Sequence, residues 1–291
     1  MSAKNVNIII KTAEKQKSET QYRDTLLRKL FEEKTRTIEL CNAVTGSNYT
    51  EDTEVILCDL DSSLTWRYND LAFAIDDKLL FMIEHQSTIS PNLPLRFLSY
   101  VSDVLSLFFV ENNELYKNNL YKIPAPKLYV LYNGKNQPKE KYLKLSDAFH
   151  LNDGKTSLEL TIEIIDVNYN SGHEVLEKSV SLQSYAYLID QVNKQINQGI
   201  KRDKAISLTI DHCIEKGILA EFLKTHYKEV SKMLNLQYDQ EAEHRAIHQN
   251  GANEKAIEMA KKLLKRGMSP IDIAEDSGLS IETVKQLQQE L

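Results

Sequence analysis

Two neighbouring apolar segments constrain the fold of this chain more than any other feature. Residues 64–75 and 79–86 both have the composition of β-strands, and only the three residues 76–78 separate them. So short a separation predicts an antiparallel hairpin. The second segment begins with five consecutive apolar residues, 79–83, without alternating polar positions. A strand of that kind is usually buried on both faces, so we expect it in the middle of a sheet.

Strand-like and helix-like patterns continue on both sides of this hairpin. Apolar residues recur at helical spacing in several segments, and short segments of strand composition lie between them. Gly46 is a helix stop, and the prolines at 91 and 94 stand where a helix start tolerates them. We predict further strands at 54–60, 127–132 and 157–168, and helices at 18–45, from 91–94 to about 112, 174–197, 203–216 and 219–234.

The composition changes after Asp239, where a highly polar stretch precedes the last helical patterns. We therefore divide the chain into a domain at 18–238 and, at 239–291, a polar linker with a small helical tail. Residues 267–287 contain two short helical patterns around Gly278, the length of a helix-turn-helix. A helical hairpin used for packing or for homo-oligomer formation fits the same pattern, and both interpretations remain open.

The hairpin places two acidic residues on one face if its turn comprises all of residues 76–78. Counting outward from such a turn sets Asp70 opposite Glu84, and directly opposed residues point to the same face. Gln86 lies two residues beyond Glu84 on that face as well. A two-residue turn would instead pair Asp70 with Ile83 and send the two carboxylates to opposite faces. The length of the turn thus decides whether the acidic residues can act together.

Two carboxylates that share one face need a cation between them, because they repel each other once they lose water. Mg²⁺ (or Mn²⁺) suits such a pair, since it prefers oxygen ligands and uses one or two carboxylates together with a phosphate. The backbone carbonyl of His85 is placed to be a further ligand, and Gln86 can orient an attacking water. Spacing alone is weak support, because acidic residues at strand ends are common.

Composition narrows the other classes of function. The formal net charge of −6 means that any DNA contact must come from local basic patches or from bound metal ions. Three cysteines without a CxxC pair argue against a disulfide framework and against a structural zinc site. The amino-terminal apolar run is too short for a signal peptide, and the longest apolar stretch is too short to span a bilayer. We expect a cytoplasmic protein that does not enter a membrane.

Several strings of this sequence closely resemble the Rpn family, the recombination-promoting nucleases also described as transposases of the PD-(D/E)xK superfamily. The resemblance covers most of the chain from about residue 20. Its specific part is the pair of strings IEHQST at 83–88 and PNLPLR at 91–96. It also extends to NDLAF at 69–73, IELCNA at 38–43 with Gly46 and Tyr49, and the segments 127–134 and 215–219.

The resemblance implies an α/β fold of the restriction-endonuclease-like kind, a mixed central β-sheet flanked by helices, here with a helical carboxy-terminal extension. It also implies magnesium-dependent DNA endonuclease activity, with a part in recombination or transposition. Asp70 and Glu84 match the metal-binding acids of the family. Gln86 occupies the position that holds lysine in the wider superfamily. Glu39 matches an extra acid that some members bring toward the metal.

Arg96 stands early in the helix that follows the hairpin, where it suits a DNA phosphate contact as well as it suits a salt bridge to a nearby acid. Two rival interpretations of the whole chain remain. One is a catalytically weak member of the fold that serves as a DNA-binding module, which the glutamine at 86 and the negative net charge favour. The other is a protein-interaction module built on the carboxy-terminal helices.

Overall fold

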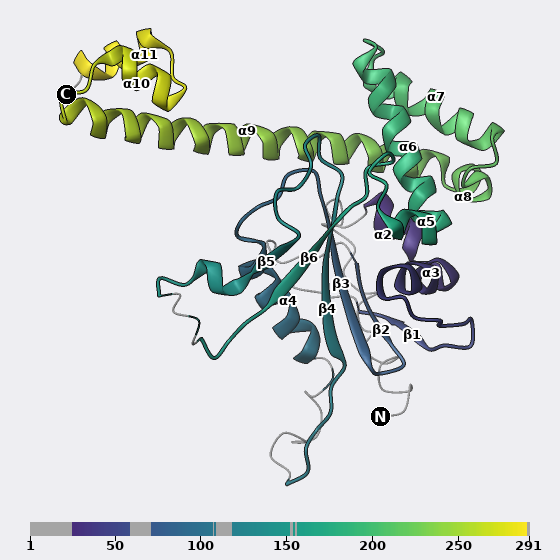
Figure 1. The fold of residues 1–291 in the computed structure, drawn as a ribbon. Helices are drawn as coiled ribbons and strands as arrows, with labels where there is room; N and C mark the ends of the chain where they lie inside the picture. The colour runs from purple at the N-terminus through teal and green to yellow at the C-terminus, as the bar shows by residue number, and fades with distance from the viewer. Residues whose placement is uncertain are drawn as a thin grey trace, which may run out of the picture. The chain divides into compact units, whose positions relative to one another are not determined.

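The computed structural model describes residues 25–58, 71–106, 108, 118–151, 154 and 156–289. The chain divides into two compact units, Met1–Asn235 and Leu236–Leu291. Within the first unit, the described residues form a six-stranded sheet in the order β1-β2-β3-β4-β6-β5 (Figure 1). The sheet is mixed and flanked by helices, as expected. Its strands are β1 (Val55–Leu57), β2 (Leu71–Ile75), β3 (Leu79–Gln86), β4 (Ala125–Tyr132), β5 (Tyr142–Lys144) and β6 (Thr161–Asp166).

The hairpin of β2 and β3 has the three-residue turn on which the predicted site depends. Ile75 pairs with Leu79, and the antiparallel register continues to the pair of Leu71 with Ile83. Asp76 and Asp77 both have φ of 51°, in the left-handed region that aspartate tolerates better than most residues. The prediction of a three-residue turn is therefore confirmed.

Strand β3 lies inside the sheet, between β2 and β4, and its apolar run is buried as expected. It pairs antiparallel with β2 and parallel with β4, and β4 in turn pairs parallel with β6. The side chains of β3 alternate between the two faces of the sheet. Leu80, Met82, Glu84 and Gln86 share one face, and Leu79, Phe81, Ile83 and His85 share the other.

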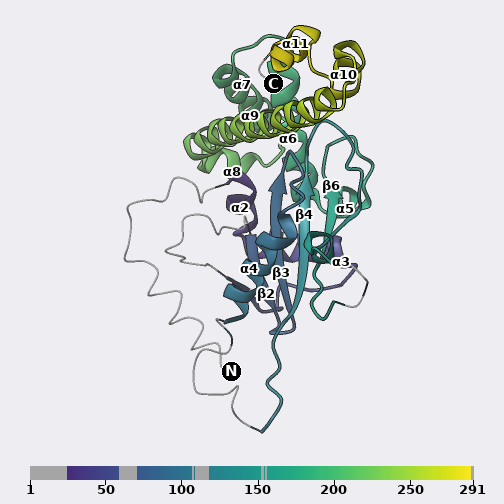
Figure 2. The same ribbon diagram turned by 90° about the vertical axis from the view of Figure 1, so that its left-hand side faces the viewer.

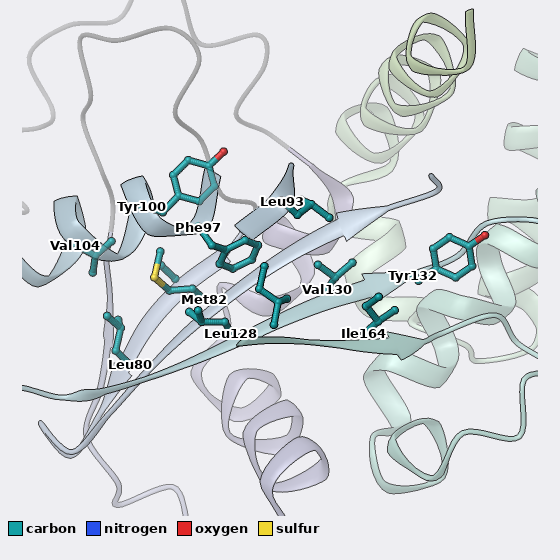
Figure 3. Packing of buried hydrophobic residues seen from close by; sticks show 12 residues of the cluster. Leu80, Met82, Leu93, Phe97, Tyr100, Val104, Leu128, Val130, Tyr132 and Ile164 are labelled. Atoms are coloured by element: carbon teal, nitrogen blue, oxygen red, sulfur yellow. The ribbon is translucent and has the colours of Figure 1, made fainter. Parts of the chain in front are cut away.

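Helix α4 (Leu93–Ser106) covers the face that carries Glu84. Its apolar side packs on β3, β4 and β6 and forms a continuous hydrophobic core on this face of the sheet (Figure 3). The helix begins with the Leu93-Pro94 pair, where proline is tolerated because the first amides of a helix have no intrahelical partner. This core includes Leu80, Met82, Leu93, Phe97, Tyr100, Leu128, Val130 and Ile164.

The helices α3, α5 (Glu174–Lys178) and α6 (Val180–Asn197) lie on the other side of the sheet from α4 (Figure 2). Helix α3 (Lys34–Thr45) ends at Gly46, whose φ of 70° is the left-handed conformation that closes a helix. Stacked aromatic rings of Phe73, Phe81 and Tyr129 fill this face of the sheet. The remaining helices of the first unit are α2 (Leu26–Phe31), α5 (Glu174–Lys178), α6 (Val180–Asn197), α7 (Arg202–Glu215) and α8 (Ala220–Thr225).

The structure corrects several predicted elements. The segment 174–197 is two helices, because Ser179 is extended and its hydroxyl caps α6 by accepting from the amide of Leu182. Residues 18–45 likewise contain the separate helices α2 and α3, and residues 1–24 are outside the described part. Strand β5 at the sheet edge and the 3₁₀ turn Leu145–Ala148 were not expected from the sequence.

The polar stretch interpreted as a linker is helical. It belongs to α9 (Tyr227–Lys265), a 39-residue helix that begins in the first unit and ends in the second. Alanine, glutamate and glutamine make up half of this stretch, and these residues favour helix even where nothing is buried. High polarity therefore does not mean an irregular linker here.

The second unit has a small core of its own. The end of α9 packs with α10 (Pro270–Ser277) and α11 (Ile281–Gln289), which meet at Gly278 with φ of 70°. Both helical patterns predicted for the tail are thus present. Ala260, Ile273, Val284 and Leu287 form the buried centre. Within the described part of the chain, no helix combines the length and apolar character needed to cross a membrane.

Candidate functional site

Glu84 is a buried carboxylate near the carboxyl end of β3. Only 1% of its surface is exposed, so ionising it without partners would be costly. The two oxygens are held by polar side chains from two elements. Nη2 of Arg96 lies 3.0 Å from Oε2 and 3.2 Å from Oε1, and the Gln86 amide donates to Oε2 at 3.1 Å. The structure therefore brings together three of the residues predicted for the site.

Arg96 and Tyr100 stand one turn apart on α4 and face the same carboxylate. Nε of Arg96 donates to the Tyr100 hydroxyl at 3.3 Å. The hydroxyl also forms a hydrogen bond with Glu84, which closes a polar triangle above the apolar core. Burial and, after it, the negative charge of Glu84 raise the pKa of Tyr100 to about 12. The Tyr100 hydroxyl therefore keeps its hydrogen at neutral pH and can donate it in a hydrogen bond. Sequence reasoning missed this contact with Glu84, because it needs the helix to pack on the sheet.

Arg96 forms a salt bridge with Glu84, which is one of the two roles predicted for it from the sequence. Its side chain is 38% exposed, whereas that of Glu84 is 2% exposed. Part of the Arg96 side chain is therefore open to solvent, while its guanidinium contacts the buried carboxylate. An arginine in that position can reach an anion arriving from outside, so a phosphate contact remains a prediction.

Asp70 lies outside the described residues. Its place in the sequence is directly before Leu71, which pairs with Ile83, the residue before Glu84. Among the residues that the structure does describe, no group of three or more histidines, cysteines, aspartates or glutamates could hold a metal ion. Around Glu84 the Gln86 side chain presents its NH2 group to the carboxylate, and Arg96 presents its guanidinium.

His85 points away from Glu84, as strand alternation predicts. Its Nε2 lies 3.2 Å from the hydroxyl of Tyr185 on α6, and the two rings meet edge to face. Burial lowers the pKa of His85 to about 4, so the imidazole is neutral at pH 7. The side chain thus fastens α6 to the sheet. The role of its backbone carbonyl as a metal ligand stays a prediction.

Glu39 extends from α3 to the start of α6. Its two oxygens accept from the amide and from the hydroxyl of Ser181, each at 2.9 Å. A carboxylate at this place satisfies an amide at the helix start and interacts favourably with the helix dipole. The structure therefore shows a capping contact for Glu39, and its approach to a metal stays a prediction.

The carboxyl ends of β3 and β4 are joined by a close backbone contact that the sequence did not reveal. The amide of Asn133 donates to the carbonyl of Gln86 at 3.1 Å. A Cβ atom added to Gly134 would lie 2.2 Å from the carbonyl oxygen of Ser87 and 2.1 Å from the Tyr132 hydroxyl, so only glycine fits there. This contact holds the strand end that carries Gln86. The Asn133-Gly134 pair, which is typical of a turn, is the sequence feature from which the contact could have been suspected.

Other residues of the family resemblance have structural roles. The side chain of Asn42 donates to the carbonyl of Tyr49 at 2.9 Å and accepts from its amide at 2.8 Å. These two bonds fix the chain after the end of the helix at Gly46.

Compared with family models, with curated proteins and with solved structures, the chain matches none of them.

Proposed function

We propose that this chain is a metal-dependent DNA endonuclease of the PD-(D/E)xK type. The observation that carries the proposal is the buried carboxylate of Glu84 at the end of a central strand, with Gln86 and Arg96 on its oxygens. A carboxylate is rarely this buried unless it is paired, and buried polar groups of this kind occur at functional sites as well as in structural ion pairs. The three-residue turn supports the pairing of Asp70 with Glu84 that the proposal requires.

In this proposal Asp70 and Glu84 hold Mg²⁺ or Mn²⁺, and the backbone carbonyl of His85 adds a ligand. The ion, when bound, supplies a lowered pKa for its bound water and offsets the charge of a phosphodiester under attack. Gln86 is neutral and cannot accept a proton at pH 7, so it orients the water or contacts the phosphate. Arg96 binds the DNA phosphate through its planar fork of donors.

One observation favours the rival in which the fold binds DNA without cutting it. Arg96 already neutralises Glu84 in the described structure, so that carboxylate needs no metal ion in order to stay buried. The presence of acidic residues at both Asp70 and Glu84 favours the nuclease interpretation. Activity that is lost on chelation separates the two interpretations.

The test is nicking of supercoiled plasmid by purified protein in Mg²⁺, in Mn²⁺ and in EDTA. We expect cleavage with either ion and none in EDTA, and we expect Asp70→Ala and Glu84→Gln to abolish it. Glu174→Gln is the matched control, because Glu174 is an exposed acid paired with Lys178 far from β3 in the sequence. Cleavage by Asp70→Ala at the rate of the unchanged protein would remove the assignment.

For the second unit, the proposals of DNA contact and of homo-oligomer formation remain side by side. Helix α11 turns Val284 and Leu287 into the core of the unit and leaves Glu282, Lys285 and Gln286 exposed. This mixture of one acid, one base and one amide fits either surface. The mass of the purified chain in solution, measured by light scattering, tests the oligomer.

A further inference from the structure

We infer that the second unit, Leu236–Leu291, pairs with the same unit of a second copy of this chain. The contact joins a basic stripe on α9 to an acidic face on α10, and it forms twice around a two-fold axis. No residue of the candidate nuclease site takes part, so this pairing goes beyond the proposed function and does not depend on it. The surface of α11 leaves the oligomer and the DNA contact open, whereas α9 and α10 favour the oligomer.

The end of α9 carries basic side chains around an exposed apolar one. Lys255, Met259 and Lys262 are separated by four and then three residues, so they lie on one side of the helix. Arg266 follows one turn later, just beyond the helix end. Met259 is 45% exposed and does not belong to the core of the unit, to which α9 contributes the buried Ala260. These four exposed residues, Lys255, Met259, Lys262 and Arg266, are the basic stripe.

Helix α10 carries the complementary surface. Ile273 is buried in the core of the unit, whereas Ile271 is 66% exposed. The exposed acids of the helix are Asp272, Glu275 and Asp276, and α10 contains no lysine or arginine. Ile271 and these three acids are the acidic face. Like the basic stripe, it combines charges of one sign with an exposed apolar side chain.

Within one chain the two surfaces do not neutralise each other. Among the described residues, no ion pair joins the basic stripe to the acidic face. Lys262 pairs with Glu258 of its own helix at 2.8 Å, but both side chains are 68% exposed, so this pair is weak and leaves Lys262 available to another acid. Two copies related by a two-fold axis satisfy both surfaces together, because the basic stripe of each faces the acidic face of the other.

A nucleic acid fits the unit less well than a second copy does. DNA phosphates would attract the basic stripe but repel the acidic face of the same small unit. They would also leave Met259 and Ile271 in water, whereas the core of a protein interface buries such side chains. Because the two surfaces are small, we expect a reversible dimer with a dissociation constant in the micromolar range.

The experiment is a charge exchange on the full chain, followed by sedimentation equilibrium from about 1 μM to about 1 mM protein. The average mass of the unchanged protein should rise toward twice the 33.5 kDa of one chain. Lys255→Glu with Lys262→Glu makes both surfaces acidic, and Glu275→Lys with Asp276→Lys makes both basic. Each double variant alone should dimerise at least about ten-fold more weakly, because like charges then meet at both contacts. An equal mixture of the two should restore the dimer.

Lys178→Glu with Lys194→Glu is the matched control, because it reverses two exposed lysines of the first unit. Its dissociation constant should change by less than about two-fold, since distant charges are screened at physiological salt. Salt provides a second measurement should a reversed variant lose helix content by circular dichroism. Raising NaCl from about 50 mM to about 500 mM should weaken the unchanged dimer at least about three-fold, and a constant or tighter dimer would overturn the inference.

Three further results would contradict the pairing. A chain that stays at 33.5 kDa throughout has no such dimer, and weaker duplex binding by Lys255→Glu with Lys262→Glu would then assign the basic stripe to nucleic acid. A dimer that neither reversed variant weakens beyond the control uses another surface. Reversed variants that stay monomeric when mixed would show that the two surfaces do not face each other.

Discussion

Removing the Arg96 guanidinium should destabilise the metal-free protein more than the loss of any surface ion pair. In Arg96→Met, the carboxylate of Glu84 stays 1% exposed but loses its cation. Breaking a buried pair from one side costs about 3–5 kcal/mol of unfolding free energy. Arg96 itself is 38% exposed, and water weakens the pair, so we expect the lower end, about 3 kcal/mol.

The reverse substitution should cost less. Glu84→Gln keeps a hydrogen-bond acceptor and leaves a guanidinium that solvent can reach, so the expected loss is about 1–2 kcal/mol. The double variant Glu84→Gln with Arg96→Met buries no unpaired charge. Its loss should therefore be smaller than the sum of the two single losses, with a coupling of about 2 kcal/mol.

Urea unfolding in EDTA, followed by circular dichroism, measures these changes as shifts of the midpoint at constant slope. Lys178→Met is the control, because Lys178 and Glu174 form a short pair of 2.6 Å in which both side chains are at least half exposed. Such a pair contributes less than about 1 kcal/mol. If Arg96→Met loses no more stability than Lys178→Met, burial of Glu84 does not depend on its arginine and the reasoning is refuted.

Three further predictions concern the remaining site residues. Gln86→Ala should lower plasmid cleavage by an intermediate factor and leave Mn²⁺ binding nearly intact, while Gln86→Lys should retain or raise cleavage. If Gln86→Ala has no effect and Gln86→Lys abolishes cleavage, Gln86 is not part of the site. Glu39→Gln keeps an acceptor for Ser181 and should cost only about 0.3–1 kcal/mol from the helix dipole. Cleavage lost with an intact fold would support the predicted catalytic role of Glu39, and unchanged cleavage would leave it only the capping role. His85 has a folded pKa of about 4 against 6.5 unfolded, so the unfolded chain binds the proton first and stability should fall as pH drops from about 6.5 to 4. His85→Asn should flatten that part of the stability profile, and an unchanged profile would contradict the burial of the imidazole.

The hairpin register and the sheet face of each β3 side chain could be predicted, because strand geometry alone determines them. The apolar run 79–83 and the three residues that precede it place the hairpin, its register and the central position of β3. Alternation along β3 then assigns Glu84 and Gln86 to one face and His85 to the other. These are short-range consequences of pleat and turn, which depend on few residues and do not need the rest of the fold.

Boundaries between helices were harder to predict, because local capping competes with helical periodicity. The pattern 174–197 is helical throughout, yet Ser179 ends one helix and caps the next. The polar composition after Asp239 suggested a linker, yet its residues have the propensity to extend α9. In both places the periodicity of apolar residues carried no information on where a helix would break.

Only the tertiary structure determines which polar side chains contact Glu84. Arg96 is 12 residues away from Glu84 in the sequence. The sequence alone was equally consistent with a phosphate contact and with a salt bridge to an acid. The packing of α4 on the sheet brings the Arg96 guanidinium to the Glu84 carboxylate. Glu39 and Ser181 are 142 residues apart, and their contact follows from the placement of α3 beside the start of α6. Polar pairing is specific at about 3 Å and carries no periodic trace along the chain. The sequence by itself determined which side chains share a face of the sheet, whereas the packing of helices on that sheet determined which of them meet.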